Sequence, residues 1–60
     1  MSQLVQFIKD NFIGATITVT LVFGGEVTGE VIDGTDNILA LRLANGSRVF
    51  INAQYIVKFF

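Results

Sequence analysis

A strict two-residue alternation in residues 16–21 is the feature that most constrains the fold of this chain. Apolar Ile17, Val19 and Leu21 alternate with three threonines. Because successive side chains of an extended strand point to opposite faces, this pattern predicts a β-strand with one buried face. The same alternation returns in residues 26–32, where Val27 and Val31 share one face. The chain is therefore expected to be mostly β.

One helix and five strands are expected along the chain. Leu4, Val5 and Ile8 recur at helical spacing after Ser2, a plausible N-cap, so a short helix is predicted at about residues 3–11. The strands are predicted at about residues 15–22, 26–32, 38–43, 47–51 and 55–60. Polar turn residues and glycines separate them, including the Asn-Gly pair at residues 45–46.

The short connections between these strands favour an antiparallel sheet. Gly29 falls on the inward face of its predicted strand, where a glycine usually marks a sharp bend or a close backbone approach. We therefore predict a mostly β fold in which a short N-terminal helix precedes a five-stranded, strongly bent antiparallel sheet. Such a sheet would form an SH3-like small barrel. Residues 1–60 are expected to make a single domain.

Composition limits how such a chain can be stabilised. It has 60 residues without cysteine or histidine, so a disulfide is excluded and a structural zinc site is not expected. Hydrophobic residues make up 52% of the chain, and six are phenylalanine. A domain of this size has too little interior to bury all of them. We therefore expect apolar surface to be buried between subunits.

The C-terminal run YIVKFF, residues 55–60, supports the same expectation. It predicts a flat apolar edge strand on which Lys58 is the only charged side chain. An open edge of this kind pairs readily with other chains. Pairing with the other edge of the next copy is a head-to-tail contact, and such contacts close into a ring when the rotation allows.

Charge and hydropathy narrow the possible partners. The formal net charge is −1, which does not favour a protein that holds nucleic acid mainly through its phosphates. Polar residues interrupt the N-terminal apolar residues, so no signal-peptide pattern is present. No apolar run reaches the roughly 18 residues of a membrane span. A cytoplasmic protein without a membrane partner is expected.

Catalysis and cofactor binding find no support in the sequence. There is no histidine, cysteine or nucleophile–base pair, and Gly24-Gly25 lies between two predicted strands rather than between a strand and a helix. Asp33 and Asp36 lie on one predicted turn, but two carboxylates are a weak metal motif. We therefore expect no enzyme activity, no cofactor and no metal.

Four segments occur in an order that matches a known family. They are FIGATITVTL at residues 12–21, the alternating set Gly25, Val27, Gly29 and Val31, the set Asn37, Ile38, Leu39 and Leu41, and VFINAQYIVKF at residues 49–59. In this order they resemble the Sm-like proteins, which include the bacterial RNA chaperone Hfq and the LSm proteins. The resemblance covers nearly the whole chain. The two middle sets are similar to the start and end of the family's first motif, and the last segment is similar to its second motif.

The resemblance implies a ring that binds RNA. The ring would be a homo-oligomer of about five to seven subunits, joined edge to edge through the fourth and fifth strands, with single-stranded RNA bound by loops around the pore. The chain departs from the family's sequence pattern at two points. Asn52 and Ala53 stand where the family commonly has Arg-Gly or Lys-His. The loop of the first motif is shorter than usual, so either Asp33 or Asp36 takes the position of the family's aspartate.

The candidate RNA-binding residues come from the two predicted turns and the start of the last strand. Amide and carboxylate groups can recognise the edge of a splayed base, and an aromatic ring can stack on its face. The candidates are Asp33, Asp36, Asn37, Asn52, Gln54 and Tyr55. Two alternatives stay open: these residues only form turns, or the ring is a structural or protein-interaction scaffold that has lost RNA binding.

Overall fold

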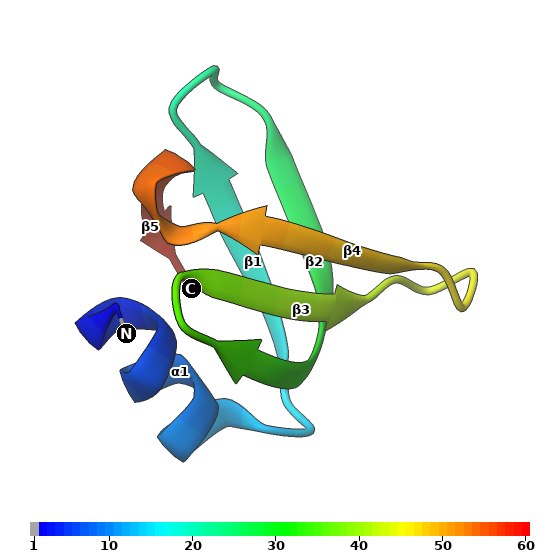
Figure 1. Cartoon of the computed structure of the whole chain (residues 1–60). Coiled ribbons are helices and arrows are strands. Elements are labelled where there is room, and N and C mark those ends of the chain that lie inside the picture. The colour runs from blue at the N-terminus through cyan, green and yellow to red at the C-terminus, as the bar shows by residue number, and fades with distance from the viewer. Residues whose placement is uncertain (1) are drawn as a thin grey trace.

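A computed structural model describes residues 2–60 as one short helix followed by a five-stranded antiparallel sheet (Figure 1). The predicted mostly β class is confirmed at this level. The elements in chain order are α1 (Gln3–Phe12), β1 (Thr16–Leu21), β2 (Glu26–Thr35), β3 (Ile38–Arg42), β4 (Arg48–Asn52), the 3₁₀ helix η1 (Ala53–Tyr55) and β5 (Ile56–Phe59). Most bounds differ from the predicted ones by one or two residues.

The strand order in the sheet is β4-β3-β2-β1-β5, with every neighbouring pair antiparallel. β4 and β5 are consecutive in the chain, yet they lie at opposite edges of the sheet, and η1 leads from one to the other. The sheet of residues 2–60 is therefore open. The expected barrel is not closed within a single chain, because no ladder joins β4 to β5.

β2 is the strand that bends the sheet. Its residues Glu26–Glu30 pair with β1, whereas Glu30–Thr35 pair with β3, and the register shifts between Val31 and Asp33. Gly29 lies at the changeover. A Cβ atom built there would stand 2.8 Å from the backbone oxygen of Arg42, so the two strands cross more closely than a side chain permits. The close backbone approach expected at this glycine is therefore present, and β2 passes from the β1 ladder to the β3 ladder at Glu30.

α1 packs against the second half of β2 at one end of the sheet (Figure 1). The Ser2 hydroxyl accepts a hydrogen bond from the Val5 amide at 3.3 Å and caps the helix. Val5 and Ile8 are fully buried against the sheet residues of the core, which are Ile17, Val19, Val31, Leu39, Leu41 and Ile51. No helix within residues 2–60 is long and apolar enough to cross a membrane.

The predicted loop at residues 33–37 is largely strand. Asp33, Gly34 and Thr35 continue β2, and only Asp36 and Asn37 form the turn into β3. Gly34 is buried beneath α1, since a Cβ atom there would lie 2.8 Å from the Val5 side chain, and its strand pairs with β3. Tertiary packing therefore overrides the turn preference of these residues. Asp36 has φ of 53°, a left-handed conformation that aspartate tolerates better than most residues.

The bend at Gly29 predicts a selective effect of adding one methyl group. Gly29→Ala should lower the free energy of unfolding by about 1–3 kcal/mol, because the new Cβ atom meets the Arg42 carbonyl and Leu41. Gly25→Ala is the matched control, since nothing lies within 4 Å of its Cβ position, and it should change stability by no more than about 0.5 kcal/mol. Urea unfolding at equal protein concentrations measures both. Equal effects would contradict the close crossing.

Candidate functional site

A polar hollow of about 320 Å³ lies where the β2–β3 turn meets the end of β4. We call it the amide hollow. The residues that line it are Ser2, Asn37, Asn52, Ala53 and Gln54. Three of the six candidate RNA-binding residues, Asn37, Asn52 and Gln54, are therefore brought together. They come from two segments that are 15 or more residues apart in the chain.

Backbone hydrogen bonds hold the three walls of the amide hollow in place. Ile38 pairs with Asn52 in the β3–β4 ladder, and the Ala53 amide donates to the Asn37 carbonyl at 2.7 Å. The Ser2 amide donates to the Asp36 carbonyl at 2.9 Å, which ties the start of α1 to the same turn. The positions of the lining side chains are thus fixed by ladder ends and a helix cap.

The amide groups in the hollow have unused hydrogen-bonding capacity. The Asn52 side-chain oxygen accepts from the Gln54 amide at 3.1 Å, so Asn52 caps η1 and offers its side-chain NH₂ group. No side-chain hydrogen bond within residues 2–60 engages Asn37 or Gln54, and both residues are exposed. The hollow also has no charged side chain among its lining residues. It can recognise a neutral polar edge by hydrogen bonds.

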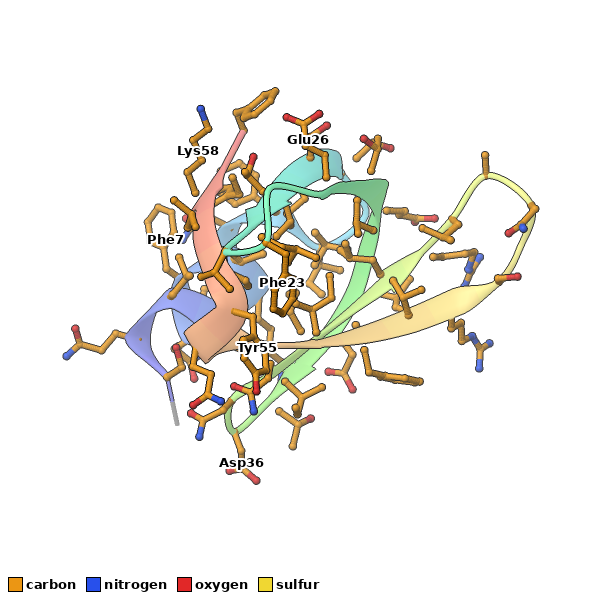
Figure 2. The ribbon with its side chains drawn as sticks, turned by 90° about the horizontal axis from the view of Figure 1, so that it is seen from above. Phe7, Phe23, Glu26, Asp36, Tyr55 and Lys58 are labelled. Carbon is orange, nitrogen blue, oxygen red and sulfur yellow. The ribbon has the colours of Figure 1, made fainter. Side chains whose placement is uncertain are left out.

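The two aspartates lie outside the hollow. Asp33 accepts a hydrogen bond from its neighbour's amide, Gly34, at 2.8 Å and faces Lys9 Nζ at 3.8 Å. Both side chains of that ion pair are well exposed, so it contributes little to stability. Asp36 offers its backbone carbonyl to Ser2, and Figure 2 shows its side chain at the outer end of the hairpin. Within residues 2–60 no cluster of acidic residues could hold a metal ion.

Tyr55 directly follows Gln54 but belongs to a different surface. Its ring lies against Phe23 at a centroid distance of 5.7 Å and an interplanar angle of 32° (Figure 2). The Tyr55 carbonyl accepts from the Val22 amide at 2.9 Å, which fixes this end of η1 beside the β1–β2 hairpin. Phe23 is 77% exposed and Tyr55 is 41% exposed. The two rings therefore form an exposed aromatic pair, of which the sequence identified only Tyr55.

Ser2 and Ala53 are the lining residues that sequence reasoning missed as site residues. Ser2 carried a local signal, since it was expected to cap α1. Its position in the hollow depends on the long-range bond from its amide to Asp36, which no local pattern predicts. Phe23 was likewise assigned to a turn. An aromatic residue beside two glycines at a hairpin tip has no core to enter, and that signal could have marked it.

The two edge strands present unpaired backbone groups. The Leu43 amide donates to Ser47, and the Ala53 amide donates to Asn37, so alternate residues of β4 bond to β3. Val49 and Ile51 are among the residues that bond to β3. Phe50 lies between these two residues, so its N–H and C=O groups point away from the sheet. Its side chain is 69% exposed. The β4 edge is therefore both unpaired and apolar.

The β5 edge has the same character. Phe60 and Thr18 exchange both backbone hydrogen bonds, at 2.7 and 2.9 Å, so the backbone of the preceding residue, Phe59, faces outward. Val57 is 61% exposed on this strand. Lys58 pairs with Thr20 in the β1–β5 ladder, so its backbone bonds inward. Apolar side chains thus stand on both edges of the open sheet.

Comparison with protein-family models, with curated proteins and with solved structures finds no match to this chain. The Sm-like resemblance therefore remains a hypothesis from the sequence. The observations that bear on function are the amide hollow, the exposed aromatic pair and the two unpaired edges.

The capping role of Asn52 predicts different effects for two substitutions. Asn52→Ala removes the acceptor of the Gln54 amide and should lower the free energy of unfolding by about 0.5–1 kcal/mol. Asn52→Asp keeps an acceptor oxygen and should change it by no more than about 0.5 kcal/mol. Thermal unfolding monitored by circular dichroism compares the two. If Asn52→Asp loses as much stability as Asn52→Ala, the cap is not the structural role of this side chain.

Proposed function

We propose that the chain is an Sm-like protein that assembles into a homo-oligomeric ring and binds single-stranded RNA without catalysis. The observation that carries this proposal is the position of β4 and β5 at the two opposite, unpaired edges of the sheet. The amide hollow lies at the end of β4, next to η1, so a ring would repeat it around the assembly.

The two unpaired edges support the proposed ring. Because β4 and β5 are at opposite ends of the sheet, one copy can use both at the same time. β4 of one copy would pair with β5 of the next, and a repeated rotation would close a ring of about five to seven subunits. This pairing covers Phe50 and Val57 and satisfies the outward-facing backbone groups.

RNA binding is supported by the chemistry of the amide hollow. Amide groups both donate and accept hydrogen bonds, which suits the edge of an unstacked base. Asn37 and Gln54 supply such groups without internal partners, and the hollow's volume lies in the range of small-ligand sites, roughly 300–1,000 Å³. On a separate surface, the aromatic pair of Phe23 and Tyr55 offers an apolar face on which a base could stack.

A second candidate function is a ring that serves as a structural or protein-interaction scaffold. Two observations favour it: the amide hollow has no cationic lining residue, and the formal net charge of the chain is −1. RNA would then have to bind with few phosphate contacts. The two candidates share the ring and differ only in the ligand of the hollow.

The ring predicts that an edge charge converts the assembly to single chains. Phe50→Glu should give a folded monomer, because it places a charge where β4 meets the next subunit. Phe23→Glu alters a still more exposed aromatic outside both edge strands and should leave the ring intact. Size-exclusion chromatography with light scattering measures the mass of each form. A wild-type monomer at micromolar concentration would refute the architecture.

RNA binding predicts a loss of affinity when the hollow loses one amide. Labelled U-rich and A-rich RNA should bind the ring, with a weak salt dependence because the hollow lacks charge. Asn37→Ala should weaken binding by about tenfold or more, whereas Asn11→Ala, an exposed position on α1, should not. Fluorescence anisotropy at low and moderate salt measures these affinities. If no RNA binds even at low salt, the scaffold function is the better one.

A further inference from the structure

A second, larger groove opens on the other side of the bend in β2. β2 and β3 are paired only from Glu30 and Arg42 onward, so the hairpin between β3 and β4 diverges from the first half of β2 (Figure 1). A hollow of about 440 Å³ lies between them, and we call it the strand groove. The residues that line it are Glu26, Val27, Thr28, Leu43, Ala44 and Asn45.

The strand groove continues along β2 into a second hollow. That hollow has a volume of about 240 Å³ and shares Thr28, Leu43 and Ala44 with the first. It runs on to the crossing of Gly29 and Arg42, where β2 and β3 meet. The groove is therefore elongated and follows the direction of a strand.

One wall of the strand groove is an unpaired strand edge. The Leu21 amide donates to Gly25 at 2.8 Å, and the Val31 amide donates to Ala15 at 2.9 Å, so alternate residues of β2 bond to β1. The residues that bond to β1 are the odd-numbered ones, from Gly25 to Val31. Glu26 and Thr28 are even-numbered, so their N–H and C=O groups point away from β1. β3 does not pair with them, so these groups face the groove.

The side chains of the groove add an apolar floor and a negative charge. Val27 and Leu43 are half-buried on opposite walls. Glu26 is exposed and has no salt bridge within residues 2–60, and Figure 2 shows its carboxylate pointing outward. Lys58 does not lie directly beside Glu26. Thr20 of β1 stands between the two, since it pairs with Glu26 on one side and with Lys58 on the other. The carboxylate is therefore available to a ligand.

The inner end of the groove carries charges of both signs, because Glu30 and Arg42 both line the second hollow. Glu30 pairs with Arg42 in the β2–β3 ladder, which places their opposite charges on neighbouring strands. Glu26 is the one charged side chain among the residues that line the first hollow of the strand groove. In that hollow the Glu26 carboxylate repels a polyanion such as RNA and attracts a chain with a lysine or arginine.

We propose that the strand groove binds an extended basic peptide from a protein partner. The peptide adds as a strand to the free edge of β2 and exchanges backbone hydrogen bonds with Glu26 and Thr28. One of its apolar side chains enters between Val27 and Leu43, and a neighbouring lysine or arginine pairs with Glu26. The site uses neither the amide hollow nor the β4 and β5 edges, so it does not depend on RNA binding or on the ring.

The probe for this site is a blocked, fluorescent peptide of alternating valine and threonine with one lysine. It should bind the full chain at least tenfold more tightly than the same peptide with N-methylated backbone amides. A peptide with glutamate in place of lysine should bind equally poorly. Titration up to millimolar peptide by fluorescence anisotropy measures the affinities. Equal binding of the lysine and N-methylated peptides would contradict strand addition.

Charge reversal identifies the residue that selects the peptide. Glu26→Lys should reverse the preference, so that the glutamate peptide binds better than the lysine peptide, and Glu26→Gln should remove it. Asp10→Lys makes the same change of charge on α1 and should leave the preference as it is. In nuclear magnetic resonance spectra the lysine peptide should shift the amides of Glu26 and Thr28. No binding, or shifts confined to β4 and β5, would overturn the proposal.

Discussion

The divided pairing of β2 is the constraint on which the rest of this structure depends. Its first half belongs to the ladder with β1 and its second half to the ladder with β3, and Glu30 takes part in both. Gly29 permits the close crossing of the Arg42 backbone, and the irregularity after Val31 turns the strand further. Without this bend the helix and the five strands could not enclose one core.

The open edges, the amide hollow and the strand groove all follow from that bend. The curved sheet carries β4 and β5 to its two open edges, where unpaired backbone and exposed apolar side chains stand together. It also brings the β2–β3 turn against the end of β4, which creates the amide hollow. Finally, it separates the first half of β2 from the hairpin after β3 and leaves the strand groove. One strand thus sets the positions of three possible contact sites.

The local parts of this arrangement could be predicted from the sequence. The alternation of Ile17 and Val19 with threonines fixes a strand and its buried face, and the inward position of Gly29 marks the bend. The extension of β2 through Gly34 could not be predicted, because it depends on contact with Val5 in α1 rather than on the neighbouring turn-forming residues. Hydrophobic pattern specifies which face is buried, but packing between distant elements decides where a strand ends.

The candidate site was predictable only as separate residues. Asn37 and Asn52 were each identified on a turn, but the β3–β4 register brings the two turns together. Tyr55 was grouped with them, and the structure instead pairs it with Phe23 across a long-range contact. Asp33 and Asp36 face away from the hollow, since one pairs with Lys9 and the other shapes the hairpin. Such groupings depend on topology, which sequence spacing alone does not contain.

Hydrogen exchange at the two edges tests the ring most directly. The amides of Phe50 and Phe59 face outward in the single chain, whereas the amide of Ile51 bonds to β3. If β4 of one subunit pairs with β5 of the next, all three amides should exchange slowly in the native protein. If the edges are free, Phe50 and Phe59 should exchange rapidly while Ile51 remains protected, and that alternating pattern would contradict the ring.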